Sequence, residues 1–168
     1  MTDFGSTAYG VCICAAITTP GGTSAIPNAT YDRIFFLTSE ISGSDEFMQK
    51  IKQSSGGTSY ASKDGKRKTS VQLANCFIVK SSFNNILQWF KTRHRAGQNP
   101  FYLIIKDLSQ GTPDWASATN TYQIGQTAAG AALNYLKCYA ERLPWNIKGI
   151  AHYISSLTLL ECTVGGSG

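Results

Sequence analysis

Residues 68–108 read KTSVQLANCFIVKSSFNNILQWFKTRHRAGQNPFYLIIKDL, and this stretch indicates the fold. Apolar residues occupy both faces along 70–80, which predicts a strand that is covered on both sides. The next apolar residues fall at helical spacing on one side: Phe83, Ile86, Leu87 and Phe90. We expect Ser82 to cap this helix and Gly97 to end it. With a second apolar run at 101–108, the stretch predicts a strand, an amphipathic helix and a strand.

The rest of the chain alternates between apolar runs and polar segments rich in glycine or serine. The polar segments at 18–30, 53–69 and 109–130 are typical of loops. Because proline cannot donate a hydrogen bond to a sheet, Pro144 is expected to mark a bulge or an edge. The apolar runs predict strands at 9–17, 31–40, 131–143 and 152–164.

A short helix is expected after residue 43. Ser44 is followed by Asp45 and Glu46, which is typical of a helix N-terminus, and Phe47, Met48 and Ile51 would form its apolar side. The chain has no internal repeat and no domain boundary. We therefore expect one domain over 1–168, mainly β, built as a barrel or sandwich of antiparallel strands with one long flanking α-helix.

Composition narrows the class of protein. The 168 residues are 42% hydrophobic and 15% charged, which excludes a disordered tail. A surface with so little charge also fits a protein that is covered by other copies of itself. The longest apolar run, 11–17, is shorter than the ~20 residues of a membrane-spanning helix. The first basic residue is Arg33, so neither a secretory signal nor membrane insertion is expected.

The residues that usually perform catalysis are few and scattered. His94 is expected on the surface, and His152 is expected to be a structural histidine. Acidic residues are scattered along the sequence, although carboxylates that are distant in sequence can still pair in the folded protein. The cysteines form no CxxC pair and are expected to be small buried hydrophobes in a reducing compartment: Cys12, Cys14, Cys76, Cys138 and Cys162. We expect no enzyme, no metal site and no cofactor.

Charge is unevenly distributed. Residues 50–95 contain ten basic residues and one acidic residue, a net charge of +9, while the rest of the chain has a net charge of −4. A basic loop contains Lys63, Lys66, Arg67 and Lys68, and the predicted helix end contains Lys91, Arg93 and Arg95. These residues could bind phosphate, remain solvated, complement the helix dipole, or attract an acidic patch on a neighbouring subunit. Only Tyr60 is an aromatic residue among them, which argues against stacking on single strands.

The segment 69–108 resembles the core of the tail-tube family of phage tails, contractile injection particles and the Hcp tubes of type VI secretion. The closing segment AALNYLKCYAERLPWNIKGIAHYISSLTLLECTV is similar to the last pair of long strands in that family. The resemblance implies a small barrel with one helix on its flank. Residues 42–69 would be a long arm loop that reaches a neighbouring ring. Residues 1–8 would be an N-terminal arm, and 165–168 a flexible tail.

The resemblance further implies a function in assembly. Subunits would form hexameric rings whose sheets join edge to edge, and the rings would stack into a tube. The expected contact residues between subunits are Lys63, Lys66, Arg67, Lys68, Arg93 and Arg95. Expected partners are further copies of the chain, sheath, tail-terminator and baseplate proteins, and the DNA or protein that passes through the lumen. The protein would be made in a host cytoplasm and reside in a virion tail or injection particle.

Two other functions remain open at this stage. A monomeric, β-rich nucleic-acid-binding module could use the basic region 63–95. A hydrolase with dispersed catalytic residues is the third hypothesis. The passenger of a tube is also open, because tubes that pass DNA tend to be lined with acid and this chain has few acidic residues.

Overall fold

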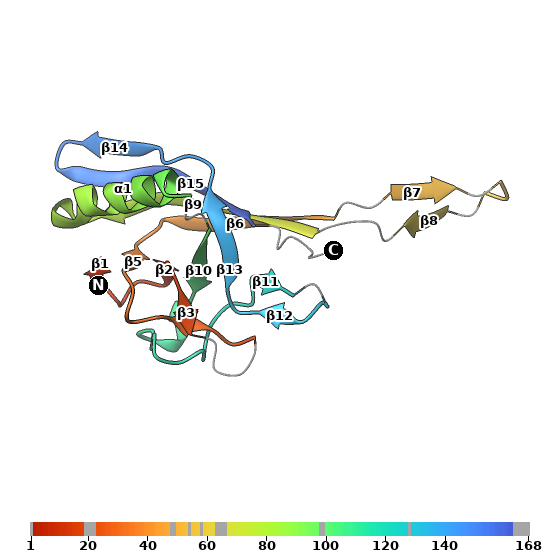
Figure 1. Cartoon of the computed structure of the whole chain (residues 1–168), viewed down its shortest axis with the longest axis horizontal. Helices are drawn as coiled ribbons and strands as arrows, with labels where there is room; N and C mark the ends of the chain where they lie inside the picture. Colours follow the sequence, from red (N-terminus) through yellow and green to blue (C-terminus); the bar gives the residue numbers. More distant parts are fainter. Residues whose placement is uncertain are drawn as a thin grey trace.

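The computed structural model describes residues 2–18, 23–47, 50–53, 55–57, 59–62, 67–97, 100–127 and 129–162. This part of the chain is mainly β with one α-helix, as predicted, and its sheets are almost entirely antiparallel (Figure 1). The large sheet has nine strands: β1 (Asp3–Phe4), β2 (Val11–Cys14), β5 (Arg33–Phe36), β6 (Glu40–Phe47), β9 (Arg67–Ile78), β10 (Phe101–Ile105), β13 (Leu136–Ala140), β14 (Trp145–Lys148) and β15 (Ala151–Glu161).

Three two-stranded sheets accompany it: β3 (Ile17–Thr18) with β4 (Ile26–Pro27), β7 (Lys50–Gln53) with β8 (Ser59–Ser62), and β11 (Gly125–Gln126) with β12 (Ala132–Leu133). The helix α1 spans Lys80–Arg95, and a 3-10 turn, η1, spans Leu108–Gln110. Within the described residues, no helix is both long and apolar enough to cross a membrane.

One bent strand closes the large sheet into a barrel. The sheet runs in the order β1-β5-β2-β10-β13-β15-β9-β6, with β14 paired to β15. Beyond β5 the chain passes to β9, where the N–H of Phe77 donates to the carbonyl of Leu37 at 2.8 Å, and it then continues as β6. The segment 33–47 therefore pairs with β2 at its start and with β9 at its end. This closure turns the apolar sides of six strands toward one core.

The barrel interior and the apolar side of α1 share this core. Phe83, Ile86, Leu87 and Phe90 of α1 are buried, as the helical spacing predicted. Phe90 packs edge-to-face on Phe101 at 5.6 Å between ring centroids. The strands contribute Val11, Ile13, Ile34, Phe36, Val71, Leu73, Leu103, Leu136, Ile154, Leu157 and Leu159.

The start of α1 differs from the prediction, whereas its end agrees. Helical backbone begins at Lys80, the N-cap is Val79, and no side chain caps it. Ser82 lies in the first turn, where its N–H donates to the carbonyl of Val79 at 2.9 Å, so the predicted cap was wrong. The physical reason is that β9 runs almost directly into α1, so the strand sets the helix start. Gly97 ends the helix with a φ of +65°, as predicted.

The strand β9 is buried on one face only, contrary to the prediction of burial on both. Its buried apolar side chains are Val71, Leu73, Cys76 and Ile78. The buried positions change from odd to even numbers near Asn75, which has a φ of +49°. Phe77 is 45% exposed on the opposite face. The sequence contains apolar residues on both faces, but only the face toward the barrel and α1 has a cover within this chain.

The predicted short helix after residue 43 is absent. Residues 40–47 form β6, which pairs antiparallel with β9 from Glu40 opposite Ala74 to Phe47 opposite Arg67. Asp45 accepts a hydrogen bond from the hydroxyl of Thr69 instead of capping a helix. The local preference of Ser44, Asp45 and Glu46 for a helix N-terminus is thus outweighed by pairing with the distant strand β9. Met48 lies outside the described residues.

Two further segments differ from the prediction. The expected loop 53–69 contains β8 and the first residues of β9. The expected single strand 131–143 is divided into β12 and β13, because the buried Asn134 turns inward. Its side chain accepts from the N–H of Ala25 at 2.6 Å and donates to the carbonyl of Ala25 at 2.9 Å. The strand predicted at 152–164 is confirmed as β15 up to Glu161, while 163–164 lie outside the described residues.

Candidate assembly surfaces

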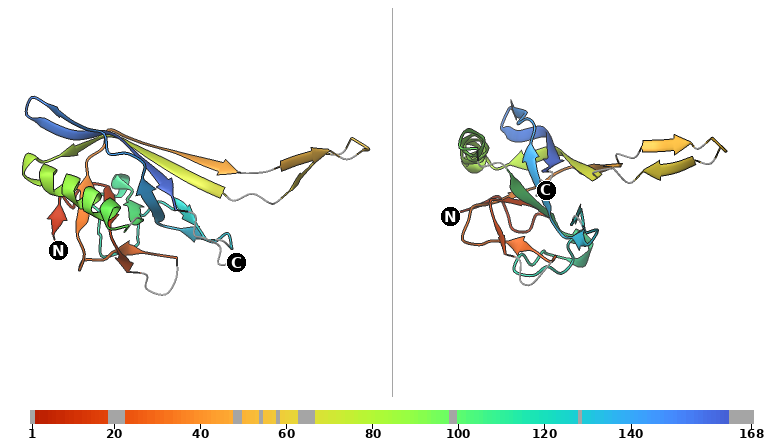
Figure 2. Two further views of the ribbon diagram at one scale, coloured as in Figure 1. Left: turned by 45° about the horizontal axis from the view of Figure 1, so that its top comes forward. Right: turned by 45° about the vertical axis from the view of Figure 1, so that its right-hand side comes forward.

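The hairpin β7–β8 forms an arm that extends far beyond the barrel (Figures 1 and 2). Its two strands pair from Lys50 opposite Ser62 to Gln53 opposite Ser59. The segment 50–68 contains six basic residues and one acidic residue. The hairpin itself contains Lys50 and Lys52, and the other four basic residues follow it at 63–68. The segment 53–62, which was predicted to be loop, thus contains strand β8 of a hairpin.

The root of the arm is held by Thr69, which is 5% exposed. Its hydroxyl donates to Asp45 of β6, and its N–H donates to the Glu161 carboxylate of β15 at 2.8 Å. Three strands are thus tied together at the point where the ribbon leaves the barrel. No local sequence pattern indicates this clamp, because its three residues are far apart in the chain.

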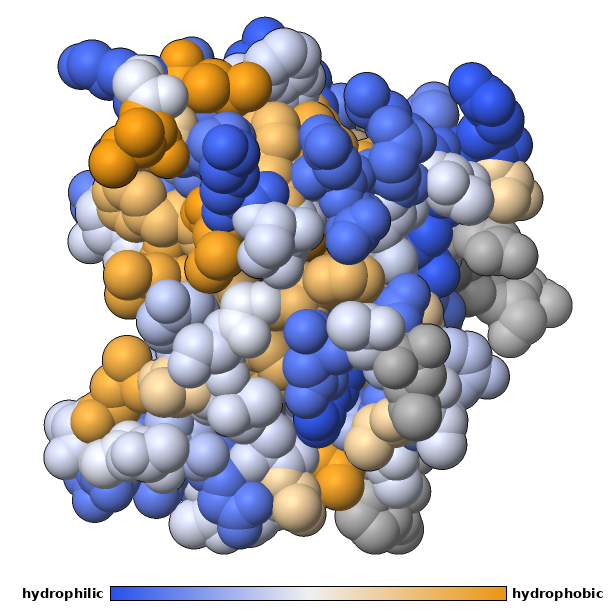
Figure 3. All heavy atoms as spheres, turned by 90° about the vertical axis from the view of Figure 1, so that its left-hand side faces the viewer, coloured by the Kyte–Doolittle hydropathy of each residue, from blue (hydrophilic) through white to orange (hydrophobic). Residues whose placement is uncertain are grey.

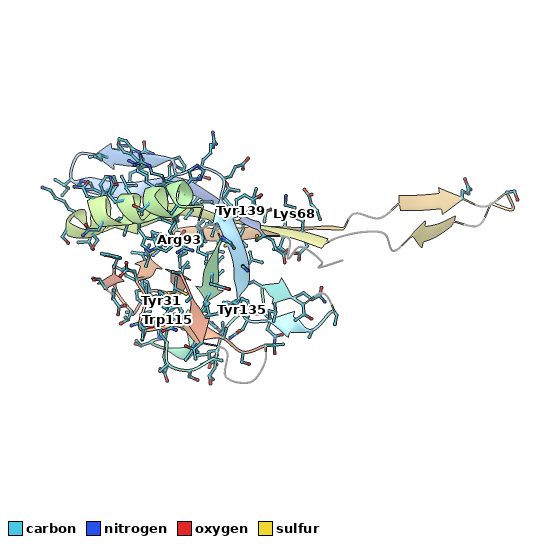
Figure 4. The ribbon with its side chains drawn as sticks, in the orientation of Figure 1. Tyr31, Lys68, Arg93, Trp115, Tyr135 and Tyr139 are labelled. Atoms are coloured by element: carbon cyan, nitrogen blue, oxygen red, sulfur yellow. The ribbon has the colours of Figure 1, made fainter. Side chains whose placement is uncertain are left out.

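The predicted contact residues divide into two groups. Arg67 and Lys68 begin β9 at the root of the arm, opposite Phe47 and Glu46, and Figure 4 shows Lys68 there. Lys63 and Lys66 lie outside the described residues.

Arg93 and Arg95 lie instead in the last turn of α1. Arg95 is exposed. Arg93 is half-buried: it donates to the carbonyl of Pro100 at 2.7 Å and stacks on Trp89 at 5.0 Å from the ring centroid. Burial lowers the pKa of the Arg93 guanidinium from its ordinary value. These contacts make Arg93 a structural side chain rather than a freely available cation.

The large sheet has two outer strands, β6 on the side that carries the arm and β14 at the opposite end (Figure 1). In the ribbon β6-β9-β15-β14, β6 pairs with β9 and β14 pairs with β15. Every residue of β14 is exposed, and so are residues 40–46 of β6. The Gly149–Ile150 turn joins β14 to β15, and positive φ at Gly149 alone is the pattern of a type II′ hairpin turn.

Hydrophobic side chains are exposed at this end of the sheet. Ile150 is 97% exposed at the turn, Ile147 is 54% exposed, and Trp145 is 50% exposed although it contacts the Phe83 ring. On the face away from α1, Phe77 and Tyr153 contact each other at 6.0 Å between ring centroids. Figure 3 views the molecule from the end with the β14–β15 turn, and hydrophobic residues gather along its left margin. An exposed apolar surface of this kind is typical of an interaction site.

A hollow of about 620 Å³ lies between α1 and the segments next to β2 and β5. Its lining includes Trp89, Arg93, Tyr31 and Asp32, of which Figure 4 labels Arg93 and Tyr31. Asp32 accepts from the N–H of Thr2 at 2.8 Å. The lining also includes Thr92, Asn85 and Gln88 of α1.

The histidines and cysteines among the described residues lie either packed against other side chains or on the surface. The ring of His152 packs on Phe83 at 4.9 Å, and His94 is exposed on α1. All five cysteines are free. Four are buried, as predicted, whereas Cys162, which was also predicted to be buried, is only partly buried. Burial raises the pKa of the Cys76 thiol to about 12, so it stays protonated at neutral pH. Among the described residues, no group of three or more His, Cys, Asp or Glu side chains could hold a metal ion.

Comparison with known proteins identifies no relative. No family model matches this chain, and neither a curated protein nor a solved structure matches it.

Proposed function

We propose that this protein is a structural subunit that assembles with copies of itself into hexameric rings, which stack into a tail tube or injection tube. The tube would conduct a genome or an effector protein, and the subunit would perform no bond chemistry. Sheath, tail-terminator and baseplate proteins would be its further partners. The particle would be a virion tail or an injection particle assembled in a host cytoplasm.

The arm β7–β8 is the observation that carries this proposal. A two-stranded hairpin is at best marginally stable alone in water. This one extends beyond its own barrel, so a surface to support it is expected on another molecule (Figure 2). Its cationic segment and the net negative charge of the remaining chain make a second copy a complementary partner.

The exposed sheet and low charge support the same proposal. β6 and β14 are both outer strands, and a long outer strand that remains unpaired invites pairing with another chain. Half-exposed Trp145, Ile147 and Phe77 lie on or next to these strands. A ring would cover them, whereas a monomer would leave them in water.

Negative-stain electron microscopy of the purified chain tests the proposal. We expect annuli and pipes of constant diameter. Solitary compact particles that bind DNA, with an affinity that falls steeply as salt rises, would replace this proposal with a nucleic-acid-binding module.

A further inference from the structure

We propose that the turn between β14 and β15 of one copy inserts Ile150 into an apolar pocket beside the start of β6 in another copy. This inference rests on the proposed function, because it names a side-chain contact between copies of an assembled subunit. The occupant of the pocket is therefore a second copy of this chain. The contact requires no backbone pairing between strands of different copies.

The pocket lies between the segments 36–41 and 105–109, at the end of three neighbouring strands where Val11 is opposite both Phe36 and Ile105. Its volume of about 410 Å³ is in the range of pockets that bind a ligand. These three buried side chains line it from the barrel core. Further apolar side chains that line it are 41–52% exposed: Leu37, Ile41, Leu108 and Tyr122. An exposed apolar surface of this kind is typical of a contact with another molecule.

The β14–β15 turn presents the apolar side chain that the contact needs. Ile150 is 97% exposed in this turn, and Ile147 close to it is 54% exposed. Figure 1 shows the turn at the end of the molecule opposite the arm. Burial of a branched aliphatic side chain in an apolar environment is favourable, because it removes apolar surface from water. A tight turn also lets one side chain enter a pocket ahead of the strands that carry it.

The turn and the pocket lie on opposite sides of the ribbon β6-β9-β15-β14. Leu37 at the pocket is opposite Phe77 of β9, Phe77 is opposite Tyr153 of β15, and Tyr153 is opposite Asn146 of β14. Three strand spacings of about 4.8 Å therefore separate the pocket from β14. The turn of one copy thus meets the pocket of another copy rather than its own, and such a head-to-tail contact can close into a ring.

The accessible charge at the pocket is acidic. Glu40 is exposed beside it, and Asp107 is held there by the N–H of Ser109, which donates to its carboxylate at 2.9 Å. Lys106 also lines the pocket, but its ammonium group donates to two carbonyls of the segment 107–122. A partner that brings a cation next to an apolar side chain would therefore match the pocket.

The β14–β15 turn has this combination of residues. Lys148 is the only residue with a formal charge in the segment 145–160, and it lies two positions before Ile150. Its side chain is exposed. Insertion of Ile150 would bring Lys148 to the acidic edge of the pocket near Glu40. Hydrophobic and charge complementarity thus both favour a second copy as the occupant.

Two aspartate variants test the contact from its two sides. Ile150→Asp and Leu108→Asp should each raise the protein concentration at half-assembly at least tenfold, because each places a carboxylate in an apolar contact. Both positions are exposed, so the circular dichroism spectra should match that of the wild type. Tyr31→Asp is the matched control, since Tyr31 is 50% exposed and lies outside both the pocket and the turn.

A mixture of the two variants tests the head-to-tail geometry. The Leu108→Asp chain keeps an intact turn, and the Ile150→Asp chain keeps an intact pocket, so one productive contact remains for each pair of chains. We expect light scattering to detect a one-to-one dimer at a concentration where each variant alone is monomeric. A mixture that stays monomeric would contradict insertion of the turn into the pocket.

A charge exchange tests the position of Lys148. Lys148→Glu should raise the concentration at half-assembly about threefold, because like charges would then meet at the edge of the pocket. Glu40→Lys should have a similar effect, and the double variant should return toward wild type. Lys91→Glu on the exposed side of α1 is the matched control. A double variant no better than its parents would show that Lys148 and Glu40 do not meet.

The outcomes separate this contact from the proposed function. Wild-type assembly that Ile150→Asp leaves unchanged would overturn the contact alone. A wild-type chain that stays monomeric would overturn both. Sedimentation of such monomers with phosphatidylglycerol vesicles, abolished by Ile150→Asp, would assign the turn to a lipid surface instead.

Discussion

Lys106 is a charged side chain in the interior, 3% exposed, beneath the segment 107–122. Its ammonium group donates to the carbonyls of Ser117 and Thr119 at 2.5 and 2.7 Å and lies over the Trp115 ring at 5.8 Å. The Trp115 indole N–H donates to the carbonyl of Thr7 at 2.7 Å. A segment predicted to be a loop is therefore attached to the barrel through one cation and one indole.

Lys106→Met keeps the length of this side chain but leaves two carbonyls without their donor. We expect the free energy of unfolding to fall by about 1–3 kcal/mol. Amide hydrogen exchange should accelerate in 107–122 more than in β9. Urea denaturation and exchange of the wild type and the variant measure both effects, and an unchanged exchange pattern would show that Lys106 does not hold the segment.

The buried thiols predict how stability depends on pH. Burial raises the pKa of Cys76 from 9.0 to about 12, and it also raises the pKa values of Cys12 and Cys138. The folded chain keeps these protons while the unfolded chain loses them above pH 9, so their contribution to stability is lost as pH rises from 9 toward 12. Burial lowers the pKa of Lys106, which acts in the opposite direction.

Comparison of the wild type with Cys76→Ala isolates one thiol. Above pH 9, the free energy of unfolding of the wild type should fall more steeply, by about 1.4 kcal/mol per pH unit. Urea denaturation at pH 7, 9 and 10 provides the measurement. Equal slopes in the two proteins would mean that Cys76 is not shielded from water.

Among the helices and strands, the periodicity of apolar residues predicted those elements whose structure depends on residues close in sequence. The apolar side of α1 and the strands β10 and β15 follow from residues close in sequence. Long-range pairing decided the rest. Asp45 and Glu46 join a strand because β9 lies beside them, and Ser82 caps nothing because β9 runs into α1. The exposure of Phe77 could not be predicted, since its sequence context is that of a buried strand.

The candidate contact residues were predicted by charge alone, and charge does not show which cations are free. Arg93 carries the same charge as Arg95, yet it packs on Trp89 and donates to Pro100. No sequence signal marked β6 as an outer strand, and only Pro144 indicated an edge next to β14, because the availability of a strand depends on the order of strands in the sheet.

The arm offers a prediction of its own. Replacing Lys66, Arg67 and Lys68 together by alanine should shorten tubes while leaving rings intact, because the cationic arm would attract the next ring less strongly. Tube length in electron micrographs is the measurement. The control Lys80→Ala with Lys91→Ala and Arg142→Ala removes the same charge from the exposed body. Tubes of unchanged length in the arm variant would exclude this role.

For the molecule as a whole, the sequence predicted a barrel or sandwich of antiparallel strands, but it did not predict the order in which the strands pair. Closure depends on the segment 33–47, which pairs first with β2 and then with β9. A bend of this kind leaves only a weak signature in local composition. Self-association was predicted from the low fraction of charged residues. That fraction describes the whole surface and cannot be assigned to a single residue.

The mass of the particle in solution distinguishes an assembled subunit from a monomer. Light scattering of the purified chain over a range of concentrations should give a mass near six times 18.2 kDa, or larger multiples as rings stack. A constant mass of 18.2 kDa up to the highest attainable concentration would contradict assembly.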